Sequence, residues 1–454
     1  MIRFAKYSSG RSEGFGVSLA DGRVTPLGAI DRQVSFEVHE KLNIVVVNDF
    51  AYFNGGAAKI ALGSAMALAL LGHSVTVFTA VGPVAPELTD TPKIEVICLG
   101  QKEIVSNPNR GQAVVQGFWN FAAATRMRVL LASLDKNETI IHVHGWTKAL
   151  SSSVVQAAIS LGFRVVITLH DYFVACPAGT FYNHPQHAIC HLRPMSAACI
   201  SSNCDSRNYR HKLWRVGRQW VQNHLGHLAE DVQEYIAIST LGEEILKPLL
   251  PRSARIHRVN NFNDVAKLPK VDVETNQHFT FSGRLSAEKG PVLFAECARD
   301  SGVEALVIGD GPLRQQVENI APEASYTGWL SHADGTAQLR RSRALVFPSL
   351  WYEMQGLVVA EAAAMGIPAI VPDTSAAREW VTDGITGFWF RGGDAKDLTA
   401  KMKSLNDNPS IAARMGDEAY SRYWRSPPTL DTHCEGLQKV YQTILTTSSI
   451  RNSG

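Results

Sequence analysis

Short apolar runs recur along the chain from residue 42 onward, and helix-length segments separate them. A first series of runs lies at residues 42–47, 73–78, 140–144, 163–169 and 234–239. A second series lies at residues 278–285, 305–311, 326–330, 344–348 and 369–372. Because apolar residues occupy successive positions, these runs are typical of parallel strands that are covered on both faces. Strands that alternate with helices predict an α/β fold built from doubly wound sheets.

A polar stretch separates the two series. Residues 260–277 contain Pro269 and few bulky side chains, which predicts a linker between domains. A chain of 454 residues is also too long to form a single core. We therefore predict two Rossmann-like domains, one at residues 41–259 and one at residues 278–425.

The two ends of the chain add smaller elements. Residues 1–40 alternate loosely between polar and apolar side chains and carry turn signals such as Asp21-Gly22, which predict a small strand-rich extension. Residues 426–454 contain an amphipathic segment at 429–445, which predicts one final helix.

A loop in the second half carries two cations that suit a diphosphate. Arg284 and Lys289 lie five positions apart where the strand at 278–285 ends. Arginine offers a planar fork to phosphate oxygens, and lysine adds a point charge. Two fixed cations stabilise the charge on a departing diphosphate and replace a divalent metal. The alternative is a pair of solvated surface cations.

Two glutamates further along the chain flank the start of a predicted helix. Glu353 precedes this helix, and Glu361 lies inside it. At the helix start, the backbone N–H groups of Gln355, Gly356 and Leu357 and the helix dipole favour a phosphate. A carboxylate further into the helix suits the two hydroxyl groups of a ribose. A solvated Glu361 is the alternative, but its neighbours are apolar and a buried carboxylate needs partners.

The first half of the chain offers weaker signals at the ends of its strands. Gly55 and Gly56 follow the first strand, where glycine lets the backbone approach a ligand or simply forms a tight turn. His170 and Asp171 follow the strand at 163–169, at the edge where parallel sheets bind ligands. A structural histidine and a turn-capping aspartate are the alternatives.

The loop from Gly283 to Gly290 and the element from Glu353 to Glu361 together resemble the donor-binding motifs of retaining nucleotide-sugar glycosyltransferases of family 4. This resemblance extends over residues 42–445. It implies the GT-B fold, in which two Rossmann-like domains face a central cleft and the last helix crosses back onto the first domain. It also implies transfer of a sugar from a nucleotide-diphosphate donor to a saccharide or lipid-linked acceptor, with retention, in polysaccharide or lipopolysaccharide biosynthesis.

Carried over by position, the resemblance assigns the donor diphosphate to Arg284 and Lys289, without a divalent metal. It assigns the ribose to Glu361 and places Glu353 near the donor sugar and diphosphate. Gln355 stands where the family often has an aromatic residue, which leaves the identity of the donor sugar open.

For the first domain, the resemblance matches Gly55 and Gly56 to the family's glycine pair. It places His170 beside the acceptor and the reacting sugar, in an orienting, electrostatic or proton-handling role. Two other functions share the fold, namely a sugar-nucleotide epimerase and a non-catalytic sugar-nucleotide-binding protein. A pyridoxal-phosphate phosphorylase is disfavoured, because no lysine stands out as the one that binds that cofactor.

The segment at 172–206 interrupts the first domain and holds four of the seven cysteines. They are Cys176, Cys190, Cys199 and Cys204. The segment is rich in proline, and a structural metal would order it. Only Cys199 and Cys204 approach the short spacing that is usual in zinc sites. A zinc ion, an iron–sulfur centre, a disulfide and unlinked thiols all stay open.

Composition and charge narrow the choice of partners. Hydrophobic residues make up 45% of the chain, charged residues 19%, and the net charge of +2 gives no reason to expect nucleic acid. The longest apolar stretch, residues 60–71, is too short to span a bilayer, and no signal peptide is evident. We expect a cytoplasmic protein, with a peripheral position at the inner membrane as a further option. The basic segment at 207–227, with Trp214 and Trp220, predicts a helix that either meets anionic lipid or packs against the core.

Overall fold

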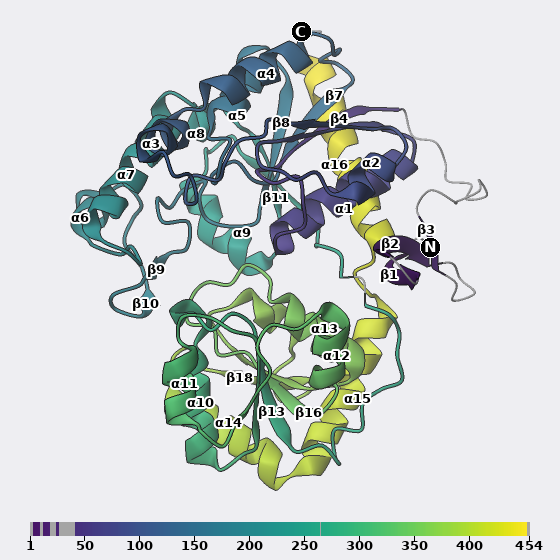
Figure 1. The fold of residues 1–454 in the computed structure, drawn as a ribbon, viewed down its shortest axis with the longest axis vertical. Helices are drawn as coiled ribbons and strands as arrows, with labels where there is room; N and C mark the ends of the chain where they lie inside the picture. Colours follow the sequence, from purple (N-terminus) through teal and green to yellow (C-terminus); the bar gives the residue numbers. More distant parts are fainter. Residues whose placement is uncertain (1–2, 10–11, 19–23, 27–40, 264, 452–454) are drawn as a thin grey trace.

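The computed structural model describes residues 3–9, 12–18, 24–26, 41–263 and 265–451. It contains two α/β domains, one above the other in Figure 1. The predicted fold class is therefore confirmed. Parts of the predicted terminal segments, residues 27–40 and 452–454, lie outside the described residues.

The N-terminal domain is built on a parallel sheet of seven strands in the order β12-β11-β8-β7-β4-β5-β6. Its strands are β4 (Asn43–Val47), β5 (Ser74–Thr79), β6 (Ile94–Cys98), β7 (Thr139–Val143), β8 (Arg164–Leu169), β11 (Glu234–Ala237) and β12 (Arg255–Arg258). The predicted strands form the interior of this sheet. The sequence pattern missed β6 and β12, the two edge strands, because their partly exposed positions carry polar side chains.

Helices cover both faces of this sheet. They are α1 (Gly56–Leu70), α2 (Pro86–Asp90), α3 (Arg110–Phe118), α4 (Phe121–Leu131), α5 (Ser153–Ser160), α7 (Tyr209–His224), α8 (Leu228–Asp231) and α9 (Thr240–Leu246). Successive residues of β4 point to opposite faces, so Val45 and Val47 join one apolar core and Ile44 and Val46 join another. This two-sided burial explains why β4 is apolar throughout.

The C-terminal domain contains a parallel sheet of six strands in the order β15-β14-β13-β16-β17-β18. Its strands are β13 (His278–Ser282), β14 (Ala305–Ile308), β15 (Ser325–Tyr326), β16 (Ser342–Val346), β17 (Ala369–Pro372) and β18 (Gly387–Phe390). Its helices are α10 (Pro291–Ser301), α11 (Arg314–Ile320), α12 (His332–Leu339), α13 (Leu357–Met365), α14 (Ala395–Asp407) and α15 (Pro409–Arg425). One apolar core joins the sheet to α10, α12, α13, α14 and α15, and Val317 of α11 packs in a smaller cluster with Ala295.

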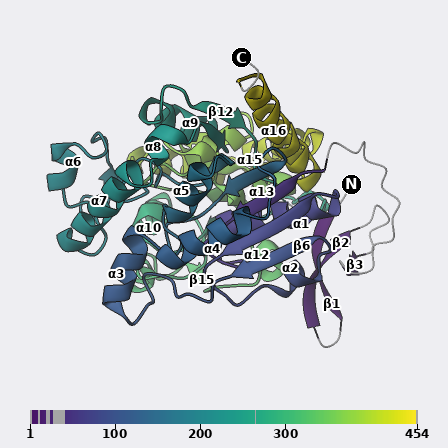
Figure 2. The same cartoon turned by 90° about the horizontal axis from the view of Figure 1, so that it is seen from above.

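A separate antiparallel sheet precedes the first domain. Its strands are β1 (Arg3–Ser9), β2 (Ser12–Ser18) and β3 (Val24–Pro26), which pair only with one another. Figure 2 shows this sheet at the edge of the molecule, beyond the helices of the N-terminal domain.

The last helix, α16 (Leu430–Arg451), returns to the N-terminal domain, as predicted. Its apolar residues complete the core that also contains α1. The Tyr441 hydroxyl lies 2.6 Å from His142 Nδ1, and His433 Nε2 lies 2.9 Å from Ser64 Oγ. None of the helices in the described part of the chain combines the length and the apolar character needed to cross a bilayer.

The contact between α16 and β7 makes a testable contribution to stability. Tyr441→Phe keeps the ring but removes the hydroxyl partner of the buried His142 Nδ1, while Thr168 Oγ1 still contacts His142 Nε2 at 2.7 Å. We expect the free energy of unfolding to fall by about 1–3 kcal/mol, measured as a lower urea midpoint of the N-terminal domain. Lys439→Ala, an exposed change on the same helix, is the control and should leave the midpoint unchanged.

Candidate functional site

The loop after β13 forms the floor of the candidate donor site. A Cβ atom at Gly309 would lie 2.0 Å from the carbonyl oxygen of Gly283, and one at Gly290 would lie 2.1 Å from that of Pro348. Both glycines also have positive φ angles, so side chains are excluded by space and by backbone conformation. The loops after β13, β14 and β16 therefore meet in close backbone contact at the carboxyl edge of the sheet.

Lys289 and Glu353 form an ion pair within this cluster of loops. The Trp351 indole N–H donates to the same Glu353 carboxylate at 3.1 Å, and its ring lies 5.2 Å from Lys289 Nζ. Both charged side chains are mostly buried, with 28% and 15% of their surface exposed. The lysine is thus held in place by a carboxylate that an incoming phosphate would have to replace.

Arg284, in contrast, is exposed and has no ion-pair partner in the part of the chain that the structure describes. It lies five residues before Lys289, in the same loop. The two cations therefore differ: one is fixed by Glu353, and the other is available to an anion at once. Its ion pair with Glu353 places Lys289 beside the loop that leads into α13.

Gly356 is the N-cap of helix α13, and its φ of +72° and ψ of 55° are left-handed. No side chain among the described residues caps this helix start, so its first backbone N–H groups are available to an anion. A Cβ atom at Gly356 would lie 2.8 Å from Ala377 Cβ, so glycine is required there. The side chain of Gln355 points to the other domain, where its Oε1 accepts a hydrogen bond of 2.6 Å from Asn261 Nδ2.

Glu361 lines a cavity of about 180 Å³ in the C-terminal domain. Gly283 and Gly309, from the loops after β13 and β14, line the same cavity, as does the segment from Trp329 to Ser331. Burial raises the pKa of the Glu361 carboxyl, while Lys59 opposes that shift. A carboxylate that lines such a cavity can accept hydrogen bonds from a ribose.

Lys59 comes from the other domain, and no motif in the sequence marks it. It lies in the first turn of α1, whose start is formed by Gly55 and Gly56. Both glycines are exposed, and nothing lies within 4 Å of a Cβ atom built on either. The sequence does offer one indication of a role for Lys59, because it is the one charged residue in the otherwise uncharged segment Gly56–Leu70.

His170 follows β8 and is joined to a second histidine. His144 Nδ1 lies 2.9 Å from His170 Nε2, and the two rings are stacked with centroids 5.2 Å apart. Burial lowers the pKa of His170 to about 3, so the imidazole is neutral near pH 7. A neutral ring favours hydrogen bonding to a sugar hydroxyl over a cationic role.

The loop after β16 also docks on the N-terminal domain. Met354 belongs to an apolar core of that domain and fills the space beside Gly242. Nearby, Glu379 accepts a 3.0 Å hydrogen bond from the Leu241 N–H group and pairs with Arg258 at 2.7 Å. The two domains are therefore in direct contact at the site, and the candidate donor loop belongs to that contact.

The comparisons with known proteins agree with this geometry. The family described as "Glycosyltransferase Family 4" matches residues 54–267, and "Glycosyl transferases group 1" matches residues 266–422. Together, the two matches span most of the chain. The chain belongs to glycosyltransferase family 4. The predicted enzyme class is thus confirmed, and the epimerase and the non-catalytic binding protein are not favoured.

Similar proteins agree with this family, and solved structures agree with the fold. The glycosyltransferase is 26% identical over 326 residues to a glycogen synthase of Mycobacterium tuberculosis, which spans 65% of this chain and 75% of the relative. It is 25% identical over 250 residues to a phosphatidyl-myo-inositol mannosyltransferase of Mycobacterium leprae, which spans 52% and 63%. Its fold is similar to sucrose-phosphate synthase of Thermosynechococcus elongatus, with a TM-score of 0.64, 16% identity and coverage of 90% and 100%. Anabaena HepE in complex with UDP gives a TM-score of 0.60, 15% identity and coverage of 88% and 100%.

The predicted metal ligands Cys176, Cys190, Cys199 and Cys204 are all free thiols, and three of them are buried. Within the described ranges, no group of three or more His, Cys, Asp or Glu side chains is arranged so that it could hold a metal ion. The disulfide that the sequence left open is not formed. Any metal would therefore have to draw these side chains together.

Asp171, next to His170, makes a pH-dependent prediction. Burial raises the pKa of its carboxyl from 3.8 to about 6. The folded protein therefore holds this proton more tightly than the unfolded chain, and stability is lost as the pH rises from 3.8 to about 6. Asp171→Asn keeps the oxygen that accepts the Phe173 N–H at 3.0 Å but carries no charge. We expect a higher melting temperature than the wild type at pH 8.

This gain should shrink as the pH falls and vanish near the ordinary pKa of an aspartate. Thermal melts from acidic to alkaline pH measure it. Asp135→Asn is the matched control, because exposed Asp135 accepts a hydrogen bond from the N–H group two residues on, at 2.8 Å. A gain of equal size in both variants, or one that does not depend on pH, would contradict the assignment to burial.

Proposed function

We propose that this glycosyltransferase moves a sugar from a nucleoside-diphosphate donor to a saccharide or lipid-linked acceptor, with retention of the anomeric configuration. The observation that carries the proposal is the Glu353-bound Lys289, which lies beside the loop that leads into the uncapped start of α13, with Arg284 in the same loop as Lys289. Glycogen synthase among the relatives supports a place in polysaccharide synthesis. Structures of HepE with UDP and UDP-glucose support a nucleotide sugar as the donor class.

In this proposal, each group of the site has a defined role towards the donor. The nucleoside occupies the cavity, and Glu361 accepts hydrogen bonds from its ribose. The diphosphate lies between the N–H groups at the start of α13 and the two cations. As the bond to the sugar breaks, negative charge grows on the diphosphate, and Arg284 and Lys289 stabilise it without a divalent metal.

The exchange of partners at Lys289 links donor binding to the position of Glu353. When Lys289 turns to a phosphate oxygen, the Glu353 carboxylate loses its cation and becomes free to accept a hydrogen bond from the donor sugar. The indole N–H of Trp351 still holds that carboxylate in place. A charge next to the reacting carbon is thus positioned only when the diphosphate is present.

The acceptor is proposed to bind on the N-terminal side, near Gly55, Gly56 and His170. His170, neutral and fixed by His144, is suited to orient a sugar hydroxyl. A leaving diphosphate oxygen on the same face of the sugar then takes the proton of the attacking acceptor hydroxyl. This front-face route retains the configuration of the donor and needs no protein nucleophile.

The donor site is tested by removing each cation. After a screen of nucleotide sugars identifies a donor, Arg284→Ala and Lys289→Ala should each lower kcat/KM for it by about 10²–10³-fold, the cost of losing one group that stabilises developing charge. Transfer is measured as nucleotide released in the presence of acceptor. Arg341→Ala, an exposed arginine of the same domain, is the control. Wild-type turnover in both test variants would rule out the donor site.

We further propose that the N-terminal domain meets an anionic lipid surface, as a lipid-linked acceptor requires. Helix α7 has an inverted polarity: Lys212, Gln219 and Gln222 are buried, whereas Leu213 and Trp220 are 44% and 49% exposed. The two glutamines are satisfied inside the protein, since Gln222 accepts from the Trp146 indole at 2.9 Å and donates to a loop carbonyl. Trp214 does not share this exposure, because it packs edge-on against Phe118.

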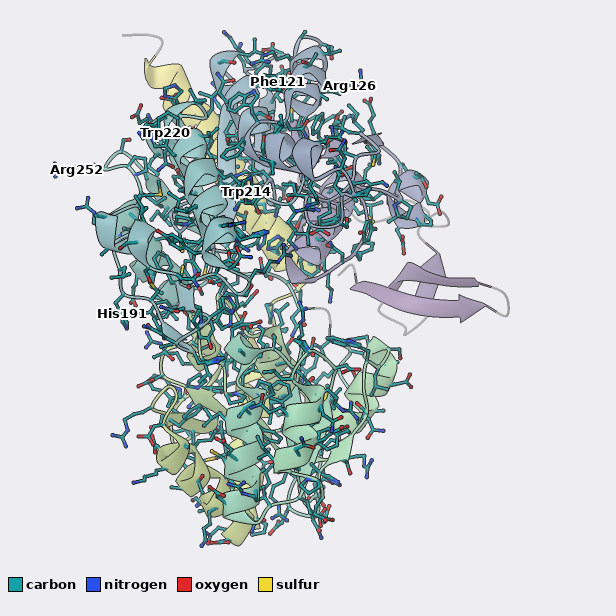
Figure 3. All side chains as sticks on the ribbon, turned by 60° about the vertical axis from the view of Figure 1, so that its left-hand side comes forward. Phe121, Arg126, His191, Trp214, Trp220 and Arg252 are labelled. Atoms are coloured by element: carbon teal, nitrogen blue, oxygen red, sulfur yellow. The ribbon has the colours of Figure 1, made fainter. Side chains whose placement is uncertain are left out.

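The neighbouring helices α3 and α4 extend this surface. Phe121 and Val129 are 67% and 56% exposed, and Arg126 lies between them on the outer side of α4. Figure 3 shows Phe121, Arg126 and Trp220 in the part of the N-terminal domain that is remote from the C-terminal domain. Neither residues 104–134 nor residues 206–229 contain a single Asp or Glu. Exposed apolar side chains among arginines that have no acidic neighbours in these segments are suited to bind a membrane with anionic headgroups.

Sedimentation with vesicles tests this surface. We expect binding to vesicles that contain phosphatidylglycerol, weaker binding at high salt, and none to pure phosphatidylcholine. The double variant Leu213→Gln and Trp220→Gln should bind at least about tenfold more weakly, because two apolar side chains are lost from the contact. Ile385→Gln, which changes an exposed apolar residue of the C-terminal domain, should bind as the wild type does. Equal binding to both lipids would argue against the proposal.

A further inference from the structure

The segment that carries the four cysteines has little apolar structure of its own. It contains β9 (Tyr182–Asn183), β10 (Ala188–Ile189) and the five-residue helix α6 (Ala197–Ser201). Within the described residues, the two-stranded sheet of β9 and β10 pairs with no other sheet. Even so, Cys176, Cys199 and Cys204 are only 7%, 6% and 5% exposed. Cys176 and Cys204 belong to the apolar core of the N-terminal domain, which anchors the base of the segment.

Backbone contacts gather the cysteines, although they lie up to 28 positions apart in the sequence. The Cys190 N–H donates to the Phe181 carbonyl at 2.7 Å, which places Cys190 across the hairpin from the turn that follows Cys176. The His184 N–H donates to the Cys204 carbonyl at 3.3 Å, which holds Cys204 against the same hairpin. Cys190 therefore directly follows the second strand of the hairpin, and Cys204 is bonded to the turn between its two strands.

Cys176 opens a tight turn that leads into this hairpin. The Gly179 N–H donates to the Cys176 carbonyl at 2.9 Å, and Gly179 has a φ of +74°. The turn leads to Phe181, whose carbonyl accepts the Cys190 N–H, so the backbone ties the Cys176 turn to Cys190.

Lys212 places a buried cation against two of the sulfurs. This lysine is 1% exposed, and its ammonium lies 3.2 Å from Cys204 Sγ and 3.5 Å from Cys199 Sγ. A buried ammonium requires a nearby anion. The one acidic residue in the segment 172–206, Asp205, pairs instead with Arg215 at 2.8 Å. The sulfurs are thus left as the partners of the lysine.

We propose that Cys176, Cys190, Cys199 and Cys204 bind one zinc ion as thiolates, with Lys212 donating hydrogen bonds to two of the bound sulfurs. Four thiolates around Zn²⁺ carry a net charge of −2, which the buried ammonium of Lys212 partly offsets. Binding releases the four thiol protons and draws the side chains from their present separation to a common centre. Because the four cysteines lie on turns and on the short helix α6, outside the large sheets, this movement leaves the rest of the domain in place.

The proposed zinc site also borders the donor loop. His191, which directly follows Cys190, packs edge-on against Tyr352, with centroids 6.5 Å apart. Figure 3 shows His191 close to the C-terminal domain. Tyr352 precedes Glu353, and the Glu353 charge raises the pKa of Tyr172, although burial is the larger cause. An ordered cysteine segment therefore fixes one wall of the contact between the domains. The zinc site itself does not depend on the proposed function.

Elemental analysis of the full-length protein tests the proposal independently of activity. Protein purified without chelator should contain about one zinc per chain. Cys199→Ser and Cys204→Ser should lose this zinc, and Cys98→Ser, a cysteine outside the cluster, should keep it. Iron with acid-labile sulfide, or a disulfide between Cys199 and Cys204 in the freshly purified protein, would overturn the zinc assignment.

Two further measurements guard against variants that fail to fold and against loss of metal during purification. Reduced, zinc-free wild-type protein titrated with Co²⁺ should develop the near-ultraviolet absorption of cobalt–thiolate bonds, and zinc should displace it. Lys212→Met should weaken zinc binding by about 10–100-fold, the usual effect of removing a group that supports metal ligands. If the wild type contains no zinc and gives no cobalt–thiolate absorption, the proposal is wrong.

Discussion

The ion pair between Lys289 and Glu353 is the interaction on which the arrangement of the site depends. Neither charge could be held with so little exposure if the other were absent, because an unpaired charge loses more by leaving water than it gains. The pair joins the loop after β13 to the loop after β16. The second of these loops is packed into the N-terminal domain through Met354. A cation of the donor site is therefore kept at the domain boundary even without a ligand.

The interior of both sheets could be predicted from the sequence, since strands such as β4 are buried on both faces and carry apolar residues throughout. Edge strands such as β12 could not be predicted. Their side chains are partly exposed, so polar and charged residues are tolerated there and no run of apolar residues marks the strand. The same logic applies to helices. The sequence around Lys212 predicts α7 but not which side faces inward, because the buried side is polar and satisfied by loop carbonyls.

The candidate site was predictable where its residues follow strands of one domain, as Arg284, Lys289 and Glu353 do. Contacts that depend on how the two domains dock could not be predicted, since no local sequence pattern encodes them. Gln355 illustrates this limit: the sequence marks it only as a departure from the family, whereas the structure shows its amide bonded to Asn261. Lys59, which acts on Glu361 across the domain boundary, is a second case.

The return of α16 to the N-terminal domain bears on the order in which the protein can fold during synthesis. The two connections between the domains run side by side, with the Asn263 N–H donating to the Pro428 carbonyl at 2.8 Å. In chain order, the whole C-terminal domain is thus an insertion into its neighbour. The N-terminal domain lacks one wall of its core until Leu437 and Tyr441 have left the ribosome. The domain that is translated first is therefore the last to be completed, which reverses the usual order of co-translational folding.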